Sequence, residues 1–402
     1  MRDEKHPNRI VIHVAGVDRP GVTARLTEII AEENATLVNI GQSVLHGYLT
    51  LSAIVDIPSS SNALRQVLFA ASELGLRLEV SAFQPAEARS TAESPALCVT
   101  VLGELSDGKA VGRITKAMAD NGMNIGEIRS LSDEGLSGLE LIADIGALEG
   151  SDTQLGELRG MFLKLGTELG VDLAVQRDDI FRRNKRLVCM DVDSTFVKGE
   201  FIDELAGLVG VKEEVAAITA RAMRGELNFK NALAERVKLL EGLPLSKAKA
   251  LADKFELTPG ADRFVKVLKS LGYRVGLVSG GFDFFVEELK ARFGLDFAFS
   301  NELEVQDGVI TGRVHGSVVD GERKAQVLKD MAKVYKCRLE QTVAIGDGAN
   351  DMLMLQAAGL GIAFRAKPKL QEVAHMSLNH HERLDTLLFL MGFSTRDIAT
   401  VT

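Results

Sequence analysis

The chain has 402 residues with 46% hydrophobic and 26% charged residues, a composition typical of a globular protein with more than one domain. Its formal net charge of -9 argues against nucleic acid as a general partner, because phosphate backbones are bound by an excess of lysine and arginine. Apolar runs stay far below the ~18 residues of a membrane span and the first residues lack an apolar signal region, so we expect a cytoplasmic protein without membrane association.

The first part of the chain contains an imperfect repeat with a period of about 85 residues, in which Asn39-Ile40-Gly41 recurs as Asn124-Ile125-Gly126. Each copy begins with an alternating apolar strand and passes through a glycine-bearing turn into an amphipathic helix. Two further strands, a second helix and a closing strand follow. The order βαββαβ predicts two ferredoxin-like domains, over residues 8–84 and 95–177, joined by a polar, proline-flanked linker.

A charged connector separates these repeats from a third domain, which we expect over residues 186–402. Its basic cluster, residues 182–186, is interpreted as a solvated connector and not as a binding patch. Beyond it, short apolar strands alternate with helices, which predicts a doubly wound α/β domain. The expected strands are 187–190, 274–279 and 342–346.

Two features interrupt this α/β pattern. Residues from about 200 to 257 are helical in pattern and carry no strand signal, which indicates a helical insertion after the first strand. Further along, Asp307-Gly308 lies between alternating residues and predicts a β-hairpin within 301–316.

Polar side chains follow each of the three expected strands. They are Asp191 and Asp193 after the first strand, Ser279, which is followed by Gly280 and Gly281, at the end of the second, and Asp347, Asn350 and Asp351 after the third. Ligands of open α/β sheets bind beyond the carboxyl ends of the strands, so we expect these groups to lie together. Lys324, near the start of an expected helix, adds a cation where helix N-H groups favour an anion.

The paired aspartates have a chemical interpretation. Several carboxylates in one place repel one another unless a divalent cation binds there, and Mg²⁺ prefers hard oxygen ligands. One carboxylate of a DxD pair can attack phosphorus and form an acyl phosphate, while the second donates a proton and later activates water. The alternative is that Asp191 and Asp193 are solvated or cap a helix, as most isolated DxD matches do.

Four motifs in order, DVDST, Ser279-Gly280-Gly281, Lys324 and GDGAND, resemble the haloacid dehalogenase superfamily of aspartate-nucleophile phosphatases. The resemblance implies that Asp191 is the nucleophile and Asp193 the general acid and base. It further implies phosphoryl binding by Ser279, Gly280 and Lys324, a Mg²⁺ site of Asp191, Asp193, Asp347 and Asp351, and a contribution from Asn350.

Within the superfamily, the stretches GEFIDELA, LNF, VSGGFD and GDGANDMLML resemble the phosphoserine phosphatases. Phe229 and Arg236 are seven residues apart and so share one helix face of the insertion. The resemblance implies that Glu200 faces the substrate ammonium, that Arg236 forks onto its carboxylate, and that Met223 and Phe229 complete the site. Taken one at a time, Met223 and Phe229 are equally well explained as ordinary core residues, and Glu200 and Arg236 as ordinary surface charges.

The amino-terminal repeats resemble ACT domains, which bind amino acids at domain interfaces. Asp18 and Gly21 fit the ligand turn of the first copy, and Asn39 offers a polar group from the next strand. The second copy has Ser106-Asp107-Gly108-Lys109 instead, which leaves its ligand binding open. Because such sites form between two ACT units, a homodimer is expected, with a purely architectural or dimerising role of the repeats as the alternative.

The resemblance as a whole implies a Mg²⁺-dependent phosphoserine phosphatase that hydrolyses O-phospho-L-serine in the last step of serine biosynthesis and is regulated by L-serine. Two alternatives stay open. One is a phosphatase of another phosphorylated amino acid, or of phosphoserine in proteins. The other is an amino-acid-sensing regulator whose phosphatase domain is a relic.

Overall fold

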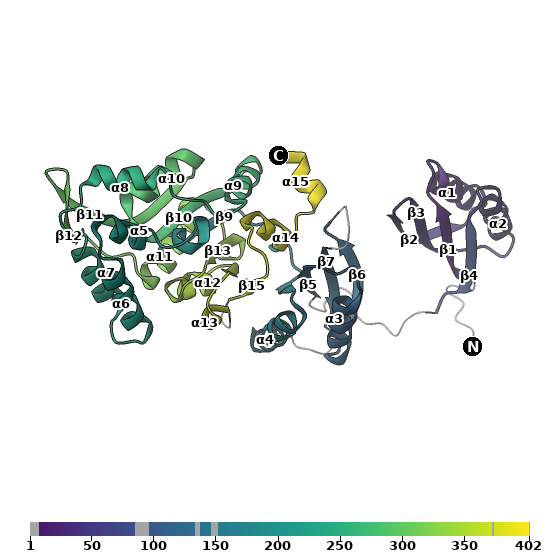
Figure 1. The fold of residues 1–402 in the computed structure, drawn as a ribbon. Coiled ribbons are helices and arrows are strands. Elements are labelled where there is room, and N and C mark those ends of the chain that lie inside the picture. Colours follow the sequence, from purple (N-terminus) through teal and green to yellow (C-terminus); the bar gives the residue numbers. More distant parts are fainter. Residues whose placement is uncertain (1–7, 85–95, 133–136, 146–151, 372–373, 402) are drawn as a thin grey trace. The chain divides into compact units, whose positions relative to one another are not determined.

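The computed structural model describes residues 8–84, 96–132, 137–145, 152–371 and 374–401. The chain forms two compact units that divide between residues 92 and 93 (Figure 1). Within the described residues, no helix is both long enough and apolar enough to cross a membrane.

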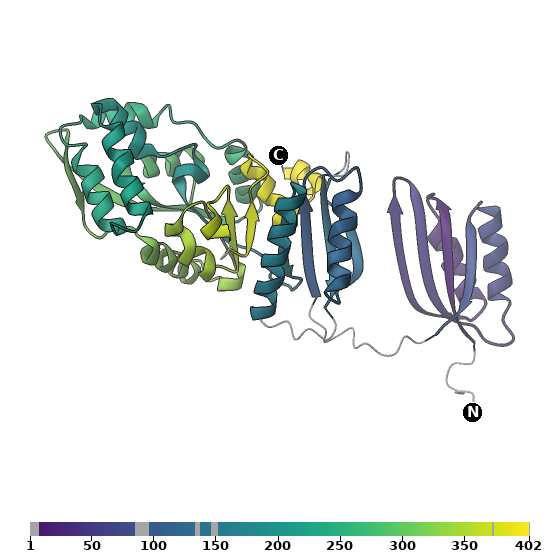
Figure 2. The same cartoon turned by 60° about the horizontal axis from the view of Figure 1, so that its bottom comes forward.

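The first unit has the predicted βαββαβ order. Its elements are β1 (Arg9–Val17), α1 (Val22–Glu32), β2 (Thr36–Leu45), β3 (Tyr48–Asp56), α2 (Ala63–Glu73) and β4 (Arg77–Ala82). The antiparallel sheet has the strand order β2-β3-β1-β4, and α1 and α2 cover one of its faces (Figure 2). Alternate residues of β1 and β3, such as Val14 and Leu51, are buried against Leu26 and Val67 of the helices because each strand presents every second side chain to that face.

The second unit begins with another βαββαβ arrangement. Its elements are β5 (Ala96–Leu102), α3 (Lys109–Asp120), β6 (Asn124–Ser130), β7 (Gly138–Asp144), α4 (Asp152–Leu169) and β8 (Asp172–Arg177). These strands lie in the order β8-β5-β7-β6, and Ile114 and Phe162 pack in the core beneath them. The predicted pair of ferredoxin-like folds is therefore confirmed.

The doubly wound core follows in the same unit. Its strands are β9 (Leu187–Met190), β10 (Arg274–Phe282), β11 (Phe297–Gln306), β12 (Val309–His315), β13 (Thr342–Gly346), β14 (Leu360–Phe364) and β15 (Met376–Leu378). Its helices include α9 (Ala261–Ser270), α10 (Asp283–Phe293), α11 (Gly321–Val334) and α12 (Met352–Ala357). Strand β9 pairs in parallel with β10 on one side and with β13 on the other, which confirms the predicted α/β fold and brings their carboxyl ends to one edge.

The predicted insertion is a cap of four helices. They are α5 (Phe201–Val209), α6 (Lys212–Met223), α7 (Phe229–Lys238) and α8 (Leu245–Ala252). The predicted hairpin is β11–β12, and both Asp307 and Gly308 of its turn have positive φ, at 53° and 79°. The hairpin lies against the cap, since Gly242 N donates to Ile310 O at 2.9 Å.

A continuous sheet joins the second ferredoxin-like fold to the doubly wound core, which the sequence analysis did not anticipate. Eleven strands form one sheet in which β15 pairs antiparallel with β8, with Met376 opposite Ala174. Beyond β15, short helices α14 (Leu387–Leu390) and α15 (Thr395–Val401) contact the same junction, where Gln176 Nε2 donates to Leu390 O at 3.0 Å.

The interpretation of residues 182–186 as a solvated connector was wrong for two of its members. Arg182 is 2% exposed and Lys185 is 6% exposed. Arg182 donates to Glu140 of β7 and, at 2.6 Å, to Asp178. The buried Glu140 carboxylate, far away in sequence, thus offsets the cost of burying the arginine charge. No local pattern identifies Glu140 as that partner.

Candidate active site

The candidate site is built on Asp191, the first residue after β9. Pairing of β9 with β13 places Asp191 N 2.9 Å from Ile345 O, at the carboxyl edge of the sheet. The residue is 4% exposed, and its Oδ1 atom accepts a hydrogen bond from Val192 N at 2.7 Å. One carboxylate oxygen is thus held by the backbone.

Lys324 lies beneath this carboxylate, in the first turn of α11. Its Nζ atom is 2.8 Å from Asp191 Oδ1 and 2.7 Å from Asp351 Oδ1, and the residue is completely buried. Burial lowers the pKa of the lysine, but Asp191 and Asp351 outweigh burial and raise it. The ammonium therefore stays charged between the two carboxylates.

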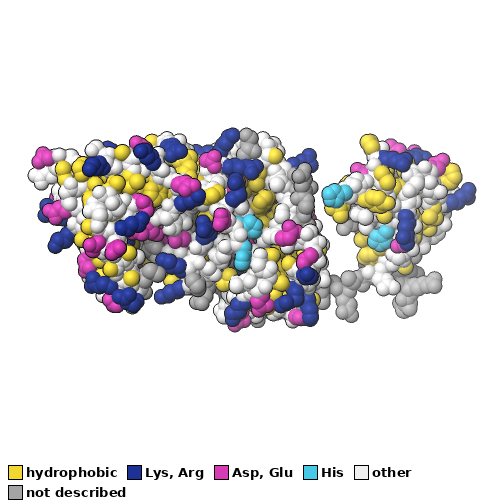
Figure 3. All heavy atoms as spheres, viewed as in Figure 1, with side chains coloured by type: hydrophobic (Ala, Val, Ile, Leu, Met, Phe, Trp, Pro, Cys, Tyr) yellow, Lys and Arg dark blue, Asp and Glu magenta, His cyan; other side chains and the backbone are white. Residues whose placement is uncertain are grey.

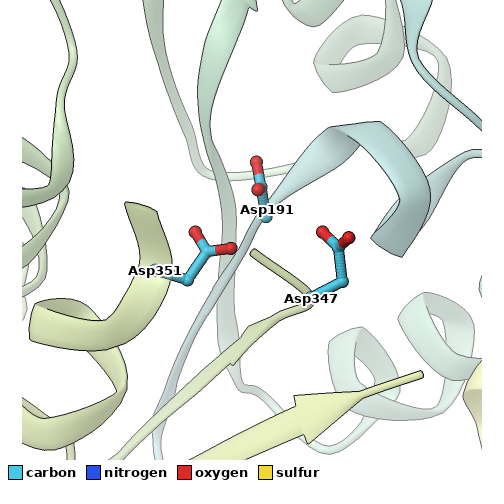
Figure 4. A group of neighbouring side chains, drawn as sticks. All are labelled: Asp191, Asp347 and Asp351. Carbon is cyan, nitrogen blue, oxygen red and sulfur yellow. The ribbon is translucent and has the colours of Figure 1, made fainter. Parts of the chain in front are cut away.

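Three carboxylates form a compact acidic group. Oxygen atoms of Asp191, Asp347 and Asp351 lie within 4.8 Å of one another, and the three residues stand directly after β9, directly after β13 and directly before α12 (Figure 4). Burial first, and then the charge of Asp191, raise the pKa of Asp347 to about 7 and that of Asp351 well above its usual value. This excess of negative charge fits a divalent cation with hard oxygen ligands.

Asp193 is not part of this acidic group, although the family resemblance implied that it is a metal ligand. Its Oδ1 atom accepts from Phe201 N at 2.8 Å, and its Oδ2 atom accepts from Ser279 Oγ at 3.4 Å. Ser194, with φ 55°, follows it in a kinked turn that leads into the cap. Burial, followed by the charge of Glu200, raises the pKa of Asp193 to about 8, so near neutral pH this carboxyl group is protonated.

The second predicted strand end supplies a tight backbone turn. Ser279 Oγ accepts from Gly281 N at 2.7 Å. A Cβ atom on Gly280 would lie 2.8 Å from Cζ of Phe229, so glycine allows the cap to approach the sheet at this point. Asn301, which the sequence gave no reason to select, fixes the turn because its Nδ2 atom donates to Gly280 O at 2.7 Å.

A cavity of about 650 Å³ lies between this edge of the sheet and the cap. Its lining includes Asp191, Asp193, Glu200, Phe229, Gly280, Arg236, Asp347 and Asn350. Ser279, Lys324 and Asp351 are buried behind its wall. The Met223 side chain is outside the described part of the structure.

The cap carries a pair of opposite charges into the cavity. Glu200 precedes α5 and accepts from Ser194 Oγ at 3.3 Å, and burial raises its pKa. Arg236 of α7 donates through Nε to Ala232 O at 3.3 Å, and burial lowers its pKa. Among the described residues, no carboxylate lies within the 4.0 Å of an ion pair with Arg236, so its guanidinium is available to an anionic ligand.

Two further groups at the site escaped the sequence analysis. Lys367 lines the cavity just beyond β14, and it lowers the pKa of Asp347 although burial and Asp191 outweigh it. Thr195 Oγ1 donates to Asp347 Oδ1 at 3.4 Å. Lys367 follows the apolar run Leu360–Phe364, which is strand β14, so its place beyond the carboxyl end of a strand is a signal that the sequence does contain.

The predicted regulatory residues lie in the first unit, and all three are exposed. Asp18 N donates to Gly47 O at 2.8 Å, and Asn39 Oδ1 accepts from Ile40 N at 2.8 Å. Gly21 precedes α1 with φ 93° and has open space where a Cβ would stand. Its positive φ is by itself a sufficient reason for glycine.

Comparison with family models gives three matches along the chain. Residues 188–356 match the haloacid dehalogenase-like hydrolases, and residues 8–81 and 96–176 each match an ACT domain.

Curated relatives extend over nearly the whole chain. The phosphoserine phosphatase SerB2 of Mycobacterium tuberculosis is 43% identical over 392 residues, which cover 97% of this chain and 94% of the relative. A phosphoserine phosphatase of Streptomyces coelicolor is 40% identical over 97% of this chain and 93% of the relative.

Solved structures give a similar result. A HAD family hydrolase from Salmonella enterica has a TM-score of 0.64 and 29% identity, over 74% of this chain and 98% of that chain. A probable phosphoserine phosphatase from Vibrio cholerae has a TM-score of 0.57 and 29% identity, over 77% of this chain and 90% of that chain.

Proposed function

The chain belongs to the phosphoserine phosphatases of the haloacid dehalogenase superfamily that carry two ACT domains, and we propose that it hydrolyses O-phospho-L-serine with Asp191 as nucleophile. The observation that carries this proposal is the buried Asp191 carboxylate at the floor of the cavity, 2.8 Å from the Lys324 ammonium. The proposed products are L-serine and phosphate, and the proposed role is the last step of serine biosynthesis.

The first step is attack on phosphorus. Asp191 Oδ1 is held by Val192 N and Lys324, so we assign the attack to Oδ2. A bond forms between Oδ2 and phosphorus while the bond between phosphorus and the seryl oxygen breaks. Lys324 offsets negative charge throughout, because it is already charged and fixed before the substrate arrives.

Asp193 supplies the proton that the leaving seryl oxygen requires. The raised pKa keeps its carboxyl group protonated near neutral pH, and its hydrogen bond from Phe201 N fixes its orientation. Once ionised, the same group accepts a proton from the water that cleaves the acyl phosphate, which returns Asp191 as a free carboxylate.

We propose that Asp191, Asp347 and Asp351 hold Mg²⁺. Their oxygen atoms lie within 4.8 Å of one another, and carboxylates are ligands that this ion prefers. When bound, the ion would neutralise negative charge on the phosphate and on the three carboxylates. We assign the Asp193 carboxylate to proton transfer, since its contacts are with Phe201 and Ser279.

The cap is proposed to select an amino acid. Arg236, a cap cation that lines the cavity, is assigned to the substrate carboxylate, and Glu200 is assigned to its ammonium. Phe229, on the same helix face as Arg236, packs over Gly280 and would contact the substrate from the cap.

A phosphate-release assay over phosphoserine, phosphothreonine, phosphotyrosine and a phosphoserine peptide, with and without Mg²⁺, tests the function. We expect rapid release from free phosphoserine alone, and only with Mg²⁺. Comparable rates on the peptide would favour a protein phosphatase, and no release from any substrate would favour a regulator with a relic phosphatase domain.

We further propose that L-serine binds the first ACT domain through Asp18 and Asn39, with Gly21 shaping the turn, and that a homodimer completes the site. Support comes from the ACT family match, from the exposure of Asp18 and Asn39, and from the position of Asp18 shortly before the N-terminus of α1. Feedback would require that serine bind one arrangement of the subunits better than another.

A cytoplasmic location is also proposed, on the amino-acid composition of the chain.

A further inference from the structure

A second cleft of about 480 Å³ lies at the amino ends of β9 and β10, at the edge of the sheet opposite to the catalytic carboxylates. Four of its lining residues are cations, Arg183, Lys185, Arg186 and Arg274, and none of the lining residues that the structure describes is acidic. On the face drawn in Figure 3, basic and acidic side chains are interspersed, and the chain carries a net charge of -9. A cleft whose charged lining residues are all cations is a local departure from that balance.

Carboxylates outside the cleft neutralise two of the four cations. Arg183 Nη2 lies 3.1 Å from Glu140 Oε2, and Arg274 Nη1 lies 2.8 Å from Asp296 Oδ1. For Lys185 and Arg186, no described carboxylate lies within the 4.0 Å of an ion pair. The cleft therefore keeps two positive charges without a paired anion.

Lys185 is the unusual member of this pair because it is only 6% exposed. Its Nζ atom donates to Glu340 O at 2.7 Å, although an ammonium group has three donors. Burial lowers the pKa of Lys185 to about 8, because the charges of Asp179 and Glu340, which raise the pKa, have smaller effects. A bound anion would offset the cost of burying this charge.

Aromatic side chains complete the wall. Tyr335 and Phe393 are partly exposed, and the Tyr273 ring packs edge-on against Phe393 at 6.4 Å. The guanidinium of Arg274 already stacks over the Tyr335 ring at 5.4 Å. Flat faces beside unpaired cations suit a ligand that has both a planar ring and anionic groups. The volume is within the range of about 300–1,000 Å³ typical of small-molecule sites.

We propose that this cleft binds a nucleotide, with its phosphates on Lys185 and Arg186 and its base against Phe393. The site is separate from the phosphoserine site, and the inference does not depend on the proposed function. Strand β9 begins at Leu187, next to the cleft, and ends at Met190, one residue before Asp191.

Calorimetric titration of the full chain without Mg²⁺ tests the proposal, with ADP, pyrophosphate and adenosine as probes. We expect ADP to bind more tightly than pyrophosphate and adenosine to bind least. Arg186→Gln removes one exposed cation and should weaken both ADP and pyrophosphate by about tenfold or more. Phe393→Leu should weaken ADP and spare pyrophosphate. The matched control is Arg113→Gln, which removes an exposed arginine of α3 that lies outside the cleft.

Three results would each overturn the proposal. They are the absence of ADP binding, equal affinities for ADP and pyrophosphate, and an equal loss in Arg186→Gln and Arg113→Gln, which would indicate unspecific attraction. Unfolding midpoints close to that of the unchanged chain ensure that a loss in either cleft variant reports on the ligand and not on the fold.

Discussion

The ammonium group of Lys324 lies 2.8 Å from Oδ1 of Asp191, and the two side chains are 0% and 6% exposed. A buried ion pair of this kind has little solvent to screen it, so removing one partner leaves a charge that the protein must accommodate. The same lysine contacts Asp351 at 2.7 Å, and it therefore couples the attacking carboxylate to the acidic group.

A double-mutant cycle measures this coupling. We expect Lys324→Met to lower the free energy of unfolding by about 3–5 kcal/mol, because it leaves Asp191 and Asp351 buried and facing each other. Adding Asp191→Asn should restore part of that loss, with a coupling energy of about 1–3 kcal/mol from urea unfolding. Additive losses would mean that the pair is not energetically coupled.

Asp191→Asn should lower the rate of phosphate release by several orders of magnitude while the unfolding transition stays cooperative, because an amide cannot form the acyl phosphate. After an acid quench, isotopic phosphate from labelled phosphoserine should remain on the unchanged chain and be missing from the variant. A variant that keeps more than about a tenth of the rate would exclude Asp191 as nucleophile.

Arg236→Lys tests the amino-acid selection by the cap. The change keeps the charge but loses the planar fork, so kcat/KM for phosphoserine should fall at least about tenfold while that for an aryl phosphate changes little. The matched control is Arg224→Lys, a cap arginine whose Nε lies 2.6 Å from the exposed Glu226. Equal losses on both substrates would assign Arg236 to phosphate binding or to folding.

Serine inhibition should depend on the first unit. Because the second ferredoxin-like fold shares its sheet with the catalytic core, the informative truncation removes residues 1–92 and keeps residues 93–402. We expect this truncation, and Asn39→Ala in the full chain, to weaken inhibition by L-serine without lowering uninhibited activity.

Ser43→Ala, on the same strand as Asn39, is the control for that experiment. Gly21 is a poor test position, since any L side chain there is strained at φ 93° whether or not a ligand binds. Unchanged inhibition after truncation would mean that serine acts as a product at the active site.

The burial of Lys185 should give the stability of the chain an unusual pH dependence. Burial lowers its folded-state pKa to about 8 from 10.5, so between these values the unfolded chain binds more protons than the folded one. The free energy of unfolding should therefore increase as the pH rises from 8 to 10.5. Below pH 8, the full cost of burying the charged lysine should lower the free energy of unfolding. Urea unfolding at several pH values should show this rise in the unchanged chain and not in Lys185→Met. The exposed Lys329→Met serves as the control, and curves of the same shape for both variants would contradict the prediction.

The sequence by itself determined the features that depend on local patterns and on the polarity of strands. Short apolar runs identified β9, β10 and β13, and parallel pairing then required Asp191, Ser279 and Asp347 to meet at one edge. Asp307-Gly308 specified the hairpin turn because both positions need positive φ. A seven-residue spacing likewise sufficed to place Phe229 and Arg236 on one face of α7.

Only the tertiary structure decided which distant groups pair. The burial of Arg182 depends on Glu140 from another strand, and the direction of the Asp193 carboxylate depends on the amide of Phe201 at the start of the cap. The edge of β8 is covered because β15, nearly two hundred residues later in the chain, supplies the next strand. Burying a polar or charged group costs free energy unless a partner offsets that cost, and the folded chain decides which partners lie near. These contacts are therefore a property of the whole fold and not of any local pattern.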